Sequence, residues 1–192
     1  MKTLAIFGDS FGVDTGNRES WVHLLKSQYK IKNFCESGIS QYKIWKQIKN
    51  NPGHQVDMNL ICHTSHSRVH VNHNPLHQNS KFHKNCDIIL ADIEQYTDEF
   101  STSAKLFFKH IYNEDYYTDI YNLMSKDIDE LCNSTPTLHV FNFERENLYQ
   151  FNNYLNLSWV RQAHSGNINH YNCTGNKLVH DMVVDRIQQC LG

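Results

Sequence analysis

The stretch Thr3-Leu4-Ala5-Ile6-Phe7-Gly8-Asp9-Ser10-Phe11-Gly12 decides the fold. Its apolar half, residues 3–7, has the length and character of a β-strand that is buried on both faces. A glycine-flanked turn follows, and a helical pattern begins soon after it, so the chain starts as strand, tight turn and helix. Such a turn can hold a serine at the carboxyl end of a central parallel strand, where open α/β sheets bind their ligands. Ser10 is therefore the candidate nucleophile.

Downstream of this turn, apolar strand-like runs alternate with helical patterns. Strands are predicted at 31–35, 56–62, 137–143 and 155–160, and helices at 19–29, 41–50, 101–113, 117–132 and 174–190. Residues 88–93 form a short apolar run that fits either state. The alternation predicts a three-layer α/β/α sandwich around a central, mostly parallel sheet of about five strands. The positions expected to face the core from the helix at 117–132 are Ile120, Leu123, Met124, Ile128 and Leu131.

Composition limits the kind of protein. The 192 residues are 40% hydrophobic and carry a formal net charge of −2. A chain of this size forms a single domain, 1–192, with a sizeable core. The near-neutral charge gives no electrostatic footprint for nucleic acid or an anionic membrane. No apolar run is long enough to span a membrane and no secretory leader precedes Thr3, which predicts a cytoplasmic protein. Six dispersed cysteines without a CxxC pair suit reduced thiols.

A serine hydroxyl needs a base to take its proton, usually a histidine. The candidate stands near the other end of the chain, in Asn167-Ile168-Asn169-His170-Tyr171-Asn172. Together the two ends resemble the SGNH, or GDSL, hydrolase family, whose first block is Gly-Asp-Ser plus an apolar residue and whose last block is Asp-x-x-His before the final helix. The resemblance covers essentially the whole chain. It implies a flavodoxin-like α/β/α fold and ester hydrolysis through an acyl-enzyme.

The resemblance also implies roles for individual residues. Ser10 is the nucleophile, His170 is the base, and the backbone N–H groups of Ser10 and Gly38 bind the oxyanion. Asn167 stands where the family has its aspartate. An amide can orient the imidazole, but it does not stabilise the imidazolium as a carboxylate does. We therefore expect a Ser10–His170 dyad that Asn167 assists weakly.

The end of the third predicted strand departs from the family pattern as well. Where the family has Gly-x-Asn-Asp, this chain has His-Thr-Ser-His-Ser-Arg at 63–68. Thr64 and Ser65 can donate hydrogen bonds, so they are candidates for the missing oxyanion donor. Arg68 could supply positive charge. With Asp9 and His66, it is assigned to substrate binding.

Residues 63–86 are crowded with histidine. Spacings of three and four residues can place imidazoles on one helical face, so a metal site is one interpretation. The segment lacks a firm helical period and a His-Glu-x-x-His motif, which favours a loop insertion that borders the mouth of the active site. No metal or organic cofactor is assigned. The histidines are His63, His66, His70, His73, His77 and His83.

These observations predict a serine esterase that hydrolyses an acyl ester, with an acetylated carbohydrate as the favoured substrate and no nucleic-acid or membrane partner. The absence of two family side chains supports an alternative, a binding or structural module that keeps the fold without efficient catalysis. A metal-dependent hydrolase that uses the histidine-rich segment is a third interpretation. The sequence does not set the oligomeric state.

Overall fold

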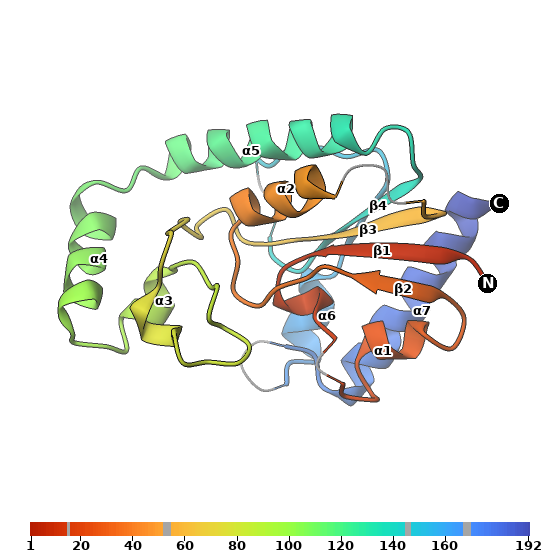
Figure 1. Cartoon of the computed structure of the whole chain (residues 1–192), viewed down its shortest axis with the longest axis horizontal. Helices are drawn as coiled ribbons and strands as arrows, with labels where there is room; N and C mark the ends of the chain where they lie inside the picture. Colours follow the sequence, from red (N-terminus) through yellow and green to blue (C-terminus); the bar gives the residue numbers. More distant parts are fainter. Residues whose placement is uncertain (15, 52–54, 145–146, 167–169) are drawn as a thin grey trace.

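The protein is built on a parallel β-sheet. The structure, a computed structural model, describes residues 1–14, 16–51, 55–144, 147–166 and 170–192. Within these residues five strands lie in the order β2-β1-β3-β4-β5, and every neighbouring pair is parallel (Figure 1). The strands are β1 (Thr3–Gly8), β2 (Lys30–Asn33), β3 (Met58–His63), β4 (Thr137–Phe141) and β5 (Tyr154–Asn156).

Helices cover both faces of this sheet, which confirms the predicted α/β/α sandwich. Helices α2 and α5 lie on one face, and α1, α6 and α7 lie on the other (Figure 1). Helices α3 and α4 lie apart from both layers, beyond the carboxyl ends of the strands. The helices are α1 (Trp21–Leu25), α2 (Gln41–Asn50), α3 (Leu90–Ile93), α4 (Glu99–His110), α5 (Glu114–Leu131), α6 (Ser158–Ala163) and α7 (Cys173–Leu191). None of the helices in the described part of the chain is both long and apolar enough to cross a membrane.

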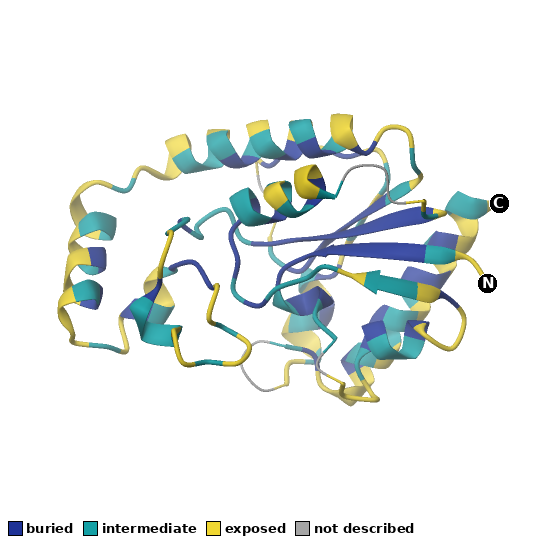
Figure 2. Cartoon of the chain, in the orientation of Figure 1, coloured by how far each residue is buried: buried dark blue, intermediate teal, exposed yellow. Residues whose placement is uncertain are grey.

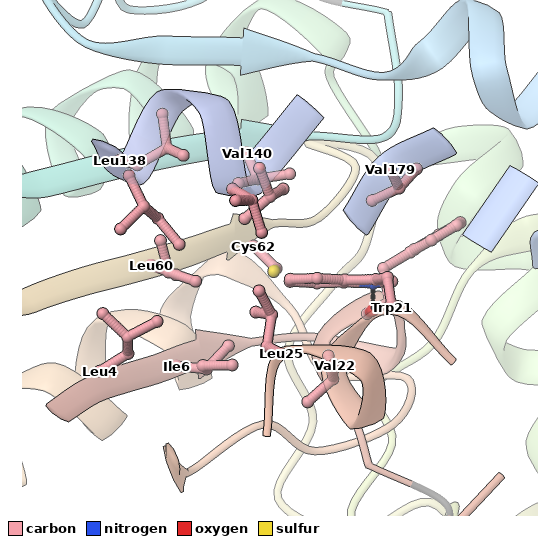
Figure 3. Close-up of a cluster of buried hydrophobic side chains, with 14 of the residues drawn as sticks. Leu4, Ile6, Trp21, Val22, Leu25, Leu60, Cys62, Leu138, Val140 and Val179 are labelled. Carbon is pink, nitrogen blue, oxygen red and sulfur yellow. Dashed lines mark hydrogen bonds between the residues drawn. The ribbon is translucent and has the colours of Figure 1, made fainter. Parts of the chain in front are cut away.

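The central strands separate two hydrophobic clusters. Alternate side chains of β1 point to opposite faces, so Leu4 and Ile6 join the cluster beneath α1 and α7, while Ala5 and Phe7 join the one beneath α2 and α5. Figure 3 shows the first cluster, where Trp21 of α1 packs among residues from the strands and α7. Burial on both faces explains why the strand of residues 3–7 is a continuous apolar run. The edge strand β2 is only partly buried (Figure 2).

The histidine-rich segment belongs to a larger insertion between β3 and β4. Its helical content among residues 64–86 is one short 3₁₀ turn, Pro75–His77. Val69 pairs with Ile88 in an isolated antiparallel bridge, and both pack with Ile93 of α3 and Ala104 of α4 in a third hydrophobic cluster. The insertion therefore has a small core of its own, and it lies at the end of the sheet where Ser10 sits.

Two local predictions were wrong, and the structure decides a third segment that the sequence left open. The expected strand at 155–160 ends at Asn156, and the next residues form α6, because the Asn156 side chain accepts a hydrogen bond from the Ser158 N–H and starts a turn. The ambiguous run 88–93 contributes the helix α3. On α5, Leu123 and Leu131 are exposed rather than in the core, and Ser125 is buried.

Candidate active site

Ser10 lies in a tight turn directly after β1. The turn is a 3₁₀ helix, Ser10–Gly12, and Asp9 caps it by accepting a hydrogen bond from the Phe11 N–H on Oδ1 at 3.1 Å. The indole of Trp21 donates to the Phe11 carbonyl oxygen at 2.7 Å. Asp9 is fully buried whereas Ser10 is partly exposed. The carboxylate of Asp9 therefore holds the turn from below, a position that does not suit the substrate contact expected from the sequence.

Glycine is required immediately before this turn. Gly8 has φ of +142°, and a Cβ there would clash with the carbonyl oxygen of Cys62 on β3. A side chain would thus strain the backbone and separate β1 from β3. The Gly of Gly-Asp-Ser lets the strand end tightly enough to place Ser10 at the edge of the sheet.

The sheet order places Ser10 at a switch point. The connection from β1 goes outward to β2 on one side, and the connection from β3 goes to β4 on the other, so the switch point lies between the carboxyl ends of β1 and β3. Open α/β sheets bind ligands in the crevice at such a point. Gly38 follows β2 and Thr64 follows β3, so both border the same crevice as Ser10.

Gly38 has the conformation and the surroundings of a required glycine. Its φ is +77°, and a Cβ would lie 2.5 Å from Cβ of Cys86. Within the described part of the chain, neither the Gly38 N–H nor the Ser10 N–H has a hydrogen-bond partner. Two backbone donors beside a serine can together stabilise a developing oxyanion.

His170 meets the Ser10 turn from the other end of the chain. Its ring lies 4.9 Å from the Phe11 ring, centroid to centroid, and its Nε2 is buried without a partner among the described residues. Burial lowers the pKa of His170 below its ordinary value, and the nearby His83 lowers it further. The neutral imidazole, which is the form that can accept a proton, therefore dominates at neutral pH.

Neighbouring residues hold His170 in this place. The Gly166 N–H donates to the His170 carbonyl oxygen at 2.5 Å. The ring of Tyr171 packs on Phe11 at 5.4 Å, and its hydroxyl donates to Asn142, which follows β4. The chain is thus anchored to the sheet on the residue after His170.

The structure brings Ser10 and His170 to one place without joining them. No hydrogen bond connects the two side chains among the residues that the structure describes. Asn167, the predicted orienting residue, lies outside the described residues. A dyad would need a side-chain movement that brings the two groups within hydrogen-bond reach, and catalytic hydrogen bonds often tighten only when substrate binds.

Arg68 brings positive charge to the crevice. Its Nη1 donates to the Ile39 carbonyl oxygen at 3.4 Å and lies 3.8 Å from the position that a Cβ on Gly38 would take. Burial raises the pKa of Asp9 to about 6, and the Arg68 guanidinium opposes that rise. Arg68 therefore acts on Asp9 in the Ser10 turn and lies beside the Gly38 backbone, and its role in substrate binding stays a prediction.

Of the other predicted donors, Thr64 faces the turn and the rest have partners elsewhere. The Thr64 side chain is buried and lies near enough to Asp9 to lower the pKa of that carboxyl, although the two groups do not reach full hydrogen-bond geometry. Ser65 Oγ lies 2.8 Å from the hydroxyl of Ser67. His66 pairs through Nε2 with Glu114 at the start of α5.

One residue that the sequence did not single out is His83. Its charge lowers the pKa of His170, and burial, followed by the charges of His77 and Arg68, lowers the pKa of His83 itself. His77 bonds Asp92 of α3 at 2.7 Å. The described residues contain no group of three or more histidine, cysteine or carboxylate side chains arranged to hold a metal ion. The sequence pattern of the six histidines in the segment does not indicate that His83 is one that acts on His170.

Comparisons with known proteins add little. No protein-family model matches the sequence. No curated protein is similar enough to count as a relative. The chain is similar to the crystal structure of a possible lipase from Chitinophaga pinensis DSM 2588, with 13% identity and a TM-score of 0.34. The match covers 73% of this chain and 48% of that one, so the chain spans about half the length of the protein it matches. A likeness this distant carries no function, and the case rests on the geometry of the site.

Proposed function

We propose that the chain is a serine ester hydrolase of the SGNH type that its sequence resembles, with Ser10 as nucleophile and His170 as general base. The observation that carries the proposal is the meeting of the chain's two ends. His170 packs on Phe11, one residue after Ser10, and no described residue forms a hydrogen bond with its buried Nε2. Its lowered pKa supports the proposal because a base must be neutral to accept a proton.

The reaction follows from these positions. Ser10 Oγ attacks the carbonyl carbon of an ester while His170 takes the hydroxyl proton, and the oxyanion is received by the N–H groups of Ser10 and Gly38 beside the Arg68 charge. His170 then gives the proton to the leaving alcohol, and an acyl group remains on Ser10. Water activated by His170 hydrolyses that acyl-enzyme and restores both residues. The favoured substrate is an acetyl ester on a carbohydrate.

Labelling with a fluorophosphonate probe tests the nucleophile. We expect the native protein to be labelled, Ser10→Ala to abolish labelling, and His170→Ala to slow it by about 10²–10⁴. Ser27→Ala and His110→Ala are the matched controls, because both side chains are exposed on helices or turns away from the crevice. The labelling is run with and without a chelator, and a loss of labelling on chelation would favour the metal-dependent alternative.

A binding module of the same fold is the second candidate. The absence of a hydrogen bond between Ser10 and His170 in the described residues favours it. A folded protein that the probe does not label, and that hydrolyses no acetyl ester, would contradict the esterase and leave the binding module. Circular dichroism of the same sample supplies the check on folding.

A further inference from the structure

Two neighbouring cavities lie between α2, the segment after β2 and the histidine-rich segment. The larger has a volume of about 410 Å³ and the smaller about 180 Å³. Glu36, Lys84 and Asn85 line both of them, so the two cavities adjoin each other. We call the pair of cavities the lysine groove, because four lysines line it. They are Lys43, Lys46, Lys81 and Lys84.

The smaller cavity of the lysine groove is lined by sequence neighbours of the candidate site, although neither Ser10 nor Gly38 lines it. Val13, which lines the smaller cavity, closes the Ser10 turn by donating its N–H to the Ser10 carbonyl oxygen at 3.4 Å. Ser37, on the same wall, directly precedes Gly38. A ligand with one end at Ser10 could therefore extend along the groove toward α2.

The groove is positively charged within a protein of net charge −2. Lys43 is neutralised by Asp87, with Nζ 2.9 Å from Oδ1. Within the described residues, Lys46, Lys81 and Lys84 form no ion pair. The one acid in the lining, Glu36, accepts a hydrogen bond from the Asn85 amide at 2.7 Å. Three ammonium groups thus face one carboxylate, which favours an anionic ligand.

The remaining walls suit a ligand that also carries hydroxyl groups. Asn50 and Asn72 present exposed amides to the larger cavity, and an amide both donates to and accepts from a hydroxyl. Phe34 adds one aromatic ring, stacked on Phe7 at 4.9 Å. The volume of the larger cavity lies within the range of about 300–1,000 Å³ that is usual for small-molecule sites. Charge alone would suit any anion, whereas amides and a ring together favour a sugar.

We propose that the lysine groove binds an anionic oligosaccharide, and that this oligosaccharide carries the ester cleaved at Ser10. Cleavage of the ester at Ser10 rests on the proposed esterase function, whereas binding of the oligosaccharide does not. The ammonium groups of Lys46 and Lys84 contact the carboxylate or sulfate groups of the sugar chain, and the amides contact its hydroxyls. The groove thereby narrows the proposed substrate class from acetylated carbohydrates to acidic acetylated carbohydrates.

Isothermal titration of the Ser10→Ala variant separates binding from catalysis. The ligands are tetragalacturonate for carboxylates, a chondroitin sulfate tetrasaccharide for sulfates together with carboxylates, cellotetraose as a neutral sugar and tetrapolyphosphate as an anion without a sugar. We expect one or both acidic sugars to bind at least tenfold more tightly than cellotetraose and tetrapolyphosphate, with affinity falling as salt rises. Equal or tighter binding of cellotetraose or of tetrapolyphosphate, or no binding of either acidic sugar, would overturn the proposal.

Charge reversal in the groove identifies the site. We expect the Lys46→Glu/Lys84→Glu pair, made in the Ser10→Ala background, to weaken acidic-sugar binding at least tenfold. Lys126→Glu on α5, an equally exposed lysine away from the groove, should leave it unchanged. All three lysines are at the surface, and thermal melts check that the variants fold. Weakening by Lys126→Glu to the same degree would show a general charge effect and overturn the site.

Turnover of acetylated oligogalacturonate by the Ser10-containing protein links the two proposals. We expect the double variant to raise KM more than it lowers kcat, and Lys126→Glu to change neither. Binding of acidic sugar without turnover would contradict the esterase proposal and support the proposal of a sugar-binding groove. Turnover of simple acetyl esters without a preference for acidic sugars would support the esterase proposal and contradict the sugar-binding groove.

Discussion

At the scale of single residues, Asp9 shows how the Ser10 turn is held at a cost to stability. The carboxyl is fully buried, and burial raises its pKa from the ordinary 3.8 to about 6. The folded protein therefore holds this proton more tightly than the unfolded chain does. The corresponding stability is fully present below pH 4 and is lost as the pH rises through about 6.

We therefore predict that Asp9→Asn stabilises the protein at pH 8. Asparagine keeps an oxygen for the Phe11 N–H and is never charged, so the unfolding free energy should rise by about 2–3 kcal/mol. At pH 5, where the native carboxyl is mostly protonated, the gain should fall to about half. Urea unfolding at both pH values measures this difference.

Asp185→Asn is the matched control, because Asp185 is exposed on α7. Its unfolding free energy should match that of the native protein at both pH values. A gain for Asp9→Asn that is as large at pH 5 as at pH 8 would contradict the buried-carboxyl explanation.

His83 gives a second residue-scale prediction. It lowers the pKa of His170, and the other charged groups that act on His83 are His77, Asp92 and Arg68. Replacing His83 with glutamine removes its charge, so we predict that the pKa of His170 rises but stays below the ordinary value, since burial remains. NMR titration of the His170 ring measures the change without requiring turnover.

The same substitution should move the acid side of the pH–rate profile toward higher pH, because His170 must be neutral to act as base. His110→Gln, an exposed change on α4, should leave both the titration and the profile in place. An unchanged His170 titration in His83→Gln would show that the two rings do not interact.

At the scale of elements, the sequence predicted those parts whose apolar pattern alone sets their position. Helix α2 spans the predicted residues 41–50, because Ile44 and Ile48 recur at helical spacing and pack against the sheet. Helix α5 spans nearly the predicted range but faces the sheet with another stripe. Ser125 is buried there since its hydroxyl accepts a hydrogen bond from Gln41 at 3.3 Å. The spacing of apolar residues does not indicate a buried polar contact between two helices.

The residues of the candidate site also include some that the sequence could place and some that it could not. Ser10 and Gly38 could be placed near each other in advance because each lies in the segment that follows a strand, and the carboxyl ends of parallel strands share one edge of the sheet. The influence of His83 on His170 could not, because His83 lies in an insertion whose path depends on packing of Val69, Ile88 and Ile93. Local pattern predicts what a strand end carries, and it does not predict where a long insertion returns.

At the scale of the whole molecule, separate hydrophobic clusters stabilise different parts of the structure. The two clusters on the sheet hold β1, β3 and β4 together and so fix Ser10. The third cluster lies within the insertion and positions the histidine-rich segment, including His83. Because the third cluster has fewer buried members among the described residues than either cluster on the sheet, the insertion should open without unfolding of the sheet.

We predict that the same isoleucine-to-alanine change destabilises only the insertion when it is made there, and the whole protein when it is made on α7. Ile93 in the insertion and Ile187 on α7 are both fully or almost fully buried, and each change to alanine should cost about 2–5 kcal/mol locally. Ile187→Ala should lower the urea midpoint of the whole protein without changing the slope of its transition. Ile93→Ala should instead speed hydrogen exchange over residues 69–110 and leave exchange in β1, β3 and β4 at the native rate. If Ile93→Ala lowered the global midpoint as far as Ile187→Ala does, the insertion and the sheet would be one cooperative unit, and loss of the insertion would then remove the Ser10 site along with the lysine groove.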